Sequence, residues 1–108
     1  MRRLPPALAA SATPQILELL GEPPARVLEL GFAGIHAVPL RLAGFDVVVV
    51  EPDPRFQEQA RERAGEVLEA IPGEPFDAVV APDGAAVPHA PTVIRVGQDG
   101  STWRSTST

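Results

Sequence analysis

The stretch RVLELGFAGIHAVPLRLAGFDVVVVEPD, residues 26–53, decides the fold. It contains a short apolar run, the turn GFAGIHA with its two glycines, an apolar segment that ends at a glycine, and the run FDVVVV followed by an acid. Short runs that are β-branched and apolar throughout are typical of strands buried on both faces. The stretch therefore predicts strands at 26–30 and 45–50, joined by a helix at about 34–43.

Further helices and strands are predicted on both sides of this stretch. Thr13 is expected to cap a short helix that ends at Gly21. In the helix at 34–43, Ile35, Val38 and Leu42 are expected on one side. The remaining predicted elements are a polar helix at 53–65, strands at 76–84 and 92–97, and a segment at 66–71 that periodicity leaves open between a strand and the end of the polar helix.

The alternation of helices and strands predicts an α/β fold with a mostly parallel sheet of about five strands and a preceding N-terminal helix. Right-handed crossovers place strands 26–30 and 45–50 side by side, with their carboxyl ends at the edge where such sheets bind ligands. We expect a flexible N-terminal arm at residues 1–13, one α/β domain at 14–97 and a polar C-terminal tail at 98–108.

The connection between the last two predicted strands is short. About ten residues separate VVAPD from TVIRV, which is too few for a helical crossover between parallel strands. One face of the sheet should therefore lack its helix. A second copy of the chain, forming a homodimer, is the simplest cover for such an exposed face.

Composition narrows the class of protein. The chain has 108 residues, a net charge of −5 and no cysteine. The negative charge opposes binding to nucleic acid, and no apolar run reaches the length of about 20 residues that a membrane span needs. His36 and His89 stand alone in the sequence, so no metal site is expected. We expect a cytoplasmic protein.

The glycine turn and the acid after the second strand together indicate a nucleotide-like cofactor. A glycine turn lets the backbone approach a ligand and directs helix N–H groups at it. Glu51 lies 20 residues beyond Gly31, the spacing at which a carboxylate accepts hydrogen bonds from the ribose hydroxyls of an adenosine. Pro52 then turns the chain away from the strand.

With the order ILELLGEPPARVLELGFAG, the chain resembles class I S-adenosylmethionine-dependent methyltransferases across roughly residues 14–97. In that family a helix precedes VLDLGxGxG. The resemblance implies a compact Rossmann-like three-layer sandwich with strand order 3-2-1-4-5, and S-adenosylmethionine as the cofactor. The family's three glycines match Gly31, Ala33 and Ile35, so the glycine motif is degenerate.

The resemblance also implies roles for individual acids. Glu29 matches the first-strand acid that contacts the methionine end of the cofactor, Glu51 the ribose acid, and Glu69 the acid near adenine. Without a ligand, Glu29 could instead cap a nearby helix, and Glu69 could be a solvated acid. The expected cofactor-binding residues are Glu29, Gly31, Ala33, Gly34, Glu51, Pro52 and Glu69.

Two other interpretations stay open. GFAGIHA also fits G-x-x-G-x-x-A, close to the turn of extended short-chain dehydrogenases, which would make the ligand NAD(P). The charge of Glu29 and the preceding helix favour the methyltransferase interpretation. Alternatively, the chain is a non-enzymatic domain that acts by self-association or through a protein partner. The sequence identifies no catalytic residue, and methyl transfer is the expected reaction if the protein is an enzyme.

Overall fold

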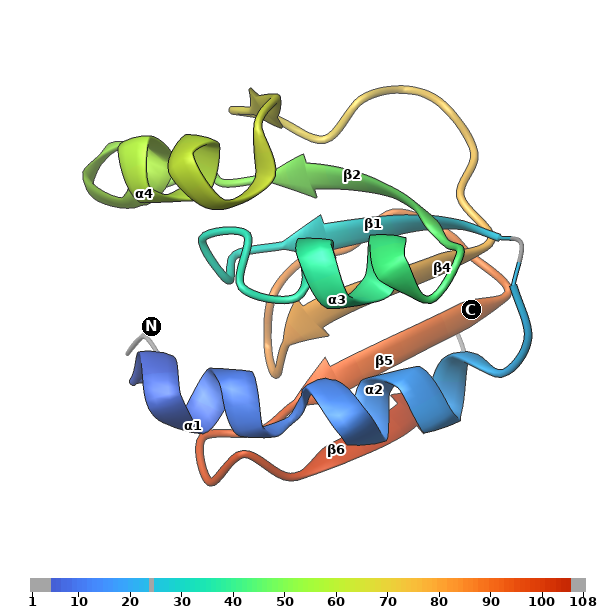
Figure 1. Ribbon diagram of the computed structural model, residues 1–108. Helices are drawn as coiled ribbons and strands as arrows, with labels where there is room; N and C mark the ends of the chain where they lie inside the picture. The colour runs from blue at the N-terminus through green and yellow to red at the C-terminus, as the bar shows by residue number, and fades with distance from the viewer. Residues whose placement is uncertain (1–4, 24, 106–108) are drawn as a thin grey trace.

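The computed structural model describes residues 5–23 and 25–105 and contains one six-stranded sheet (Figure 1). The strands are β1 Arg26–Leu30, β2 Asp46–Val50, β3 Val67–Leu68, β4 Ala78–Pro82, β5 Thr92–Val96 and β6 Thr102–Ser105. The helices are α1 Pro6–Ser11, α2 Thr13–Leu20, α3 Ala37–Leu42 and α4 Pro54–Ala64. The strand order is β3-β2-β1-β4-β5-β6, parallel throughout except for β6, which pairs antiparallel with β5.

The α/β class and the mostly parallel sheet are confirmed, and two differences from the prediction lie at the ends of the chain. Where a flexible arm was predicted at 1–13, residues 6–11 form α1, whose Ala9 is buried in the core. Within the predicted tail at 98–108, residues 102–105 form β6, a sixth strand. Residues 1–4 and 106–108 of these two segments lie outside the described residues.

Two apolar clusters cover the two faces of the sheet differently. One cluster joins strand side chains such as Val27 and Val49 to residues of all four helices, and Figure 1 shows α1, α2 and α3 in front of the sheet. The opposite cluster joins Leu28, Val79 and Val93 to residues of the connecting loops and contains no helix residue among those described. The described chain therefore has helices on one face only, and the three-layer prediction does not describe it.

The helix-free face is nevertheless covered. Phe76 and Ala90, from the loops that enter and leave β4, pack on it. As a result Leu28, Val79 and Val93 are at most 1% exposed. For the described residues, the prediction that this face lacks a helix is confirmed, and the loops of the same chain bury much of it. The homodimer stays a prediction.

Two of the apolar residues predicted on one side of the helix at 34–43 are exposed. Val38 is 45% exposed and Leu42 83% exposed, whereas Ala37 and Leu40 are fully buried. Residues 34–36 belong to the turn rather than to the helix, so α3 begins at Ala37 and its inward positions shift. No helix in the described part of the chain is long and apolar enough to cross a membrane.

Candidate functional site

A pocket of about 820 Å³ lies at the edge where the parallel strands end. Its floor includes the last residues of four strands, namely Leu30, Val50, Pro82 and Val96. Residues from the start of α1, from α4 and from the loop after β3 form further parts of its wall. This is the edge at which open α/β sheets bind ligands.

The turn between β1 and α3 has an unusual backbone. Gly31, Ala33 and Gly34 all have positive φ angles, of 79°, 52° and 75°. A Cβ atom added at Gly34 would lie 3.2 Å from the carbonyl oxygen of Ala60 on α4. Gly34 is therefore needed both for its backbone conformation and for the close packing of the turn against α4.

Glu51 holds the turn from the end of β2. Its side chain is fully buried, with Oε1 accepting a 3.0 Å hydrogen bond from the N–H of Ala33 and Oε2 accepting a 3.0 Å bond from the N–H of Asp53. The side-chain amide of Gln57 donates to the Glu51 carbonyl oxygen at 3.0 Å, which ties this corner to α4. Glu51 thus links the turn after β1 to the chain that leaves β2.

Glu29 lies beneath the turn and does not line the pocket. It is fully buried, and its Oε2 accepts a 2.6 Å hydrogen bond from the N–H of His36, the residue before α3. Burial raises the pKa of Glu29 from 4.5 to about 7, because a charged carboxylate loses its hydration there. This geometry matches the helix-capping interpretation of Glu29.

His36 connects the turn to α2. Its Nδ1 lies 2.7 Å from the Thr13 hydroxyl in a buried hydrogen bond, and its ring meets that of Phe32 edge-on at 4.8 Å between centroids. Burial lowers the pKa of His36 from 6.5 to about 4, so the ring is neutral near pH 7. The predicted capping role of Thr13 is wrong, since Ala12 is the N-cap of α2 and Thr13 makes no such bond.

The structure brings most of the predicted cofactor-binding residues together. Those that line the pocket are Gly31, Ala33, Glu51, Pro52 and Glu69, whereas Glu29 and Gly34 do not line it. Sequence reasoning missed Arg55, Gln59 and Arg63, which also line it. Their spacing of four residues along the polar helix places them on one face, a signal that the sequence contained. No comparable sequence signal indicated that residues at the start of α1 would line the pocket.

The charge of the pocket is negative on balance. Among the described lining residues the acids are Glu51, Asp53, Glu69 and Asp83, and the cations are Arg55 and Arg63. Arg55 forms a 2.7 Å ion pair with Asp53. No group of three or more potential metal ligands occurs in the part of the chain that the structure describes.

Two comparisons with known proteins give no match. A scan against protein-family models finds none that fits this chain, and a search of curated proteins finds none either.

Proposed function

We propose that this chain is a small S-adenosylmethionine-dependent methyltransferase-like protein that binds S-adenosylmethionine or S-adenosylhomocysteine in the pocket. The observation that carries the proposal is the wall where the turn after β1 meets Glu51 at the end of β2. This wall places a close backbone approach next to a carboxylate, the combination that suits an adenosine ribose.

The hydrogen bonds of the turn favour an adenosyl ligand over NAD(P). A dinucleotide's pyrophosphate needs N–H groups at the start of the helix. Here the N–H groups of Ala33 and His36 donate to the two buried glutamates. Those of Ile35 and Ala37 donate to carbonyl oxygens inside the turn. These four amides are therefore engaged within the protein and are poorly suited to hold a phosphate.

The charge of the pocket lining also favours S-adenosylmethionine over NAD(P). A dinucleotide brings two negative phosphates, whereas S-adenosylmethionine carries a positive sulfonium, a positive amine and a carboxylate, and is positive on balance. Four acids and two arginines line the pocket among the described residues. Opposite charges attract more strongly in a partly desolvated pocket than in water, so this lining suits the cationic ligand better.

The bonding of Glu51 is compatible with a ribose. An ionised carboxylate has about four acceptor positions on its two oxygens. Two backbone amides use part of this capacity. Glu51 would thus hold the turn and contact a ligand hydroxyl at the same time. We assign no catalytic residue, because methyl transfer can proceed largely by positioning the acceptor beside the sulfonium.

A second candidate function is a protein that acts by self-association or through a protein partner, without a cofactor. One observation favours it. Glu29 and Glu51 both support the turn by hydrogen bonds within the chain. Buried carboxylates that support a turn in this way stabilise the fold whether or not a ligand binds.

Calorimetric titration with S-adenosylhomocysteine, with NAD in parallel, tests the proposal. We expect micromolar binding of S-adenosylhomocysteine and a loss of about tenfold or more in Glu51→Gln, because a hydrogen bond to a charged group is removed. Glu66→Gln is the control, since it removes the same charge from an exposed residue outside the pocket. Tighter binding of NAD would overturn the proposal.

Ile35→Gly separates the first candidate from the second. Ile35 lines the pocket but has no positive φ angle, so the variant reports on the removed side chain rather than on backbone strain. If neither the wild type nor this variant binds S-adenosylhomocysteine or NAD, the second candidate is favoured. Sedimentation velocity of the wild type would then test for self-association.

A further inference from the structure

Ala33 has a backbone conformation that its side chain opposes. It is the only non-glycine residue with positive φ in the described part of the chain, with φ at 52°. For a residue with a Cβ atom this left-handed conformation is sterically unfavourable, and it persists only where the surroundings hold it. The side chain is 4% exposed, so the strain lies inside the protein.

Two charged side chains hold Ala33, one by its N–H and the other by its carbonyl oxygen. Its N–H donates to Glu51 Oε1 at 3.0 Å, and its carbonyl oxygen accepts a hydrogen bond from Arg63 Nη1 at 3.1 Å. We call these three residues the Ala33 clamp. Hydrogen bonds to charged groups are stronger than those between neutral groups, so the clamp opposes relaxation of the backbone.

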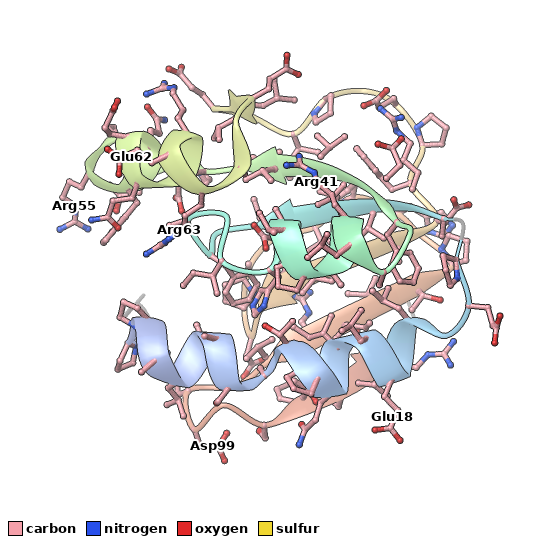
Figure 2. The ribbon with its side chains drawn as sticks, in the orientation of Figure 1. Glu18, Arg41, Arg55, Glu62, Arg63 and Asp99 are labelled. Atoms are coloured by element: carbon pink, nitrogen blue, oxygen red, sulfur yellow. The ribbon has the colours of Figure 1, made fainter. Side chains whose placement is uncertain are left out.

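The two arms of the clamp come from different elements. Glu51 follows β2, and Arg63 belongs to the last turn of α4. Figure 2 shows the Arg63 side chain extending from α4 beside the turn that links β1 to α3. All three residues of the clamp line the pocket. The position of α4 is thereby connected to the shape of the pocket wall.

We propose that Arg63 is a positioning residue for ligand binding, which keeps Ala33 in its left-handed conformation and so forms the pocket wall before the ligand arrives. This inference rests on the proposed adenosyl-binding function. A wall that is already formed spares the ligand the cost of ordering it. A glycine would adopt this conformation without support, whereas Ala33 needs the clamp to hold it.

The binding experiment compares three variants in titrations with S-adenosylhomocysteine. We expect Arg63→Gln to weaken binding by about three- to tenfold, because glutamine is uncharged and is too short to donate the same hydrogen bond to the Ala33 carbonyl oxygen. Arg61→Gln is the matched control, since it removes the same charge from the same helix outside the pocket. Arg63→Gln combined with Ala33→Gly should regain wild-type affinity within about twofold, because glycine adopts the conformation without a clamp.

Amide hydrogen exchange on the protein without ligand provides a test that is independent of the proposed function. The Ala33 N–H should exchange faster in Arg63→Gln than in the wild type and in Arg61→Gln. Unchanged exchange would overturn the positioning role. If the exchange changes but the wild type does not bind S-adenosylhomocysteine, the clamp stands and the proposed function fails. If Ala33→Gly does not restore binding lost in Arg63→Gln, Arg63 contacts the ligand directly and the inference is wrong.

Discussion

A 2.6 Å hydrogen bond from the His36 N–H to the Glu29 carboxylate joins these two residues, yet burial shifts the pKa values of their side chains in opposite directions. Burial raises the pKa of Glu29 from 4.5 to about 7 and lowers that of His36 from 6.5 to about 4. Both side chains are therefore favoured in their neutral forms. Each is fully buried, and one oxygen of Glu29 and Nε2 of His36 have no partner within the described residues.

We expect these two groups to offset each other in the pH dependence of stability. The folded state binds the Glu29 proton more tightly than the unfolded state does. The contribution of Glu29 to the free energy of unfolding is therefore present below pH 4.5 and is lost as the pH rises to about 7. The contribution of neutral His36 is present above pH 6.5 and is lost as the pH falls to about 4. Each shift corresponds to about 3 kcal/mol at most.

Urea unfolding across this pH range would separate the two contributions. Glu29→Gln should gain stability relative to the wild type as the pH rises from 4.5 to 7, because the opposing contribution of Glu29 is gone. His36→Gln should lose stability relative to the wild type as the pH rises from 4 to 6.5. A Glu29→Gln profile parallel to that of the wild type would contradict the raised pKa.

Thr13→Val should destabilise the protein by about 1–3 kcal/mol, because the buried ring of His36 loses the hydroxyl 2.7 Å from its Nδ1. Thr13→Ser is the control, since it keeps a hydroxyl at this position. Thermal unfolding of both variants at pH 7 would measure the difference. A loss in Thr13→Ser with no loss in Thr13→Val would mean that the methyl group, and not the hydrogen bond, matters here.

Gly34→Ala should cost more stability than Gly65→Ala, although both glycines have positive φ angles. A Cβ atom at Gly65 meets nothing within 4 Å, whereas one at Gly34 lies 3.2 Å from Ala60 O and from Ala64 Cβ. We expect about 1 kcal/mol at Gly65 from backbone strain and about 3 kcal/mol at Gly34, where α4 must also move. Chemical unfolding would show the order, and similar losses would argue against close packing of the turn on α4.

Leu42→Gln should change stability by less than about 0.5 kcal/mol, because this side chain is 83% exposed. Leu40→Ala, two positions earlier on α3, should cost about 2–5 kcal/mol, because Leu40 is fully buried. Thermal unfolding of the pair tests which side of α3 faces the core. A large loss in Leu42→Gln would contradict the exposed position of this side chain.

The sequence predicted those parts of the fold that depend on local patterns. The run of valines in β2 and the glycine turn after β1 identified a parallel α/β unit, and this unit is confirmed. The spacing from Gly31 to Glu51 placed both residues at the same pocket, because parallel strands end at the same edge of the sheet. These predictions needed no knowledge of distant contacts.

The missed features depend on contacts between distant parts of the chain. The short, proline-rich segment of α1 is ordered as a helix by the packing of Ala9 on the core. Residues Thr102–Ser105 of β6 look like a polar tail, and they become a strand only because β5 offers an edge. The inward side of α3 depends on where the preceding turn ends, which sequence periodicity does not determine.

The position of β1 at the centre of the sheet has a consequence for how the chain folds. Val27 pairs with Val47 on one side and with Ala78 on the other. The second pairing joins segments roughly fifty residues apart, and closing such a loop costs entropy before any contact repays it. We therefore expect β1, α3 and β2 to form first and the β1–β4 pairing to limit the folding rate, as is usual for folds rich in distant contacts. Both walls of the pocket would come together only at that late step.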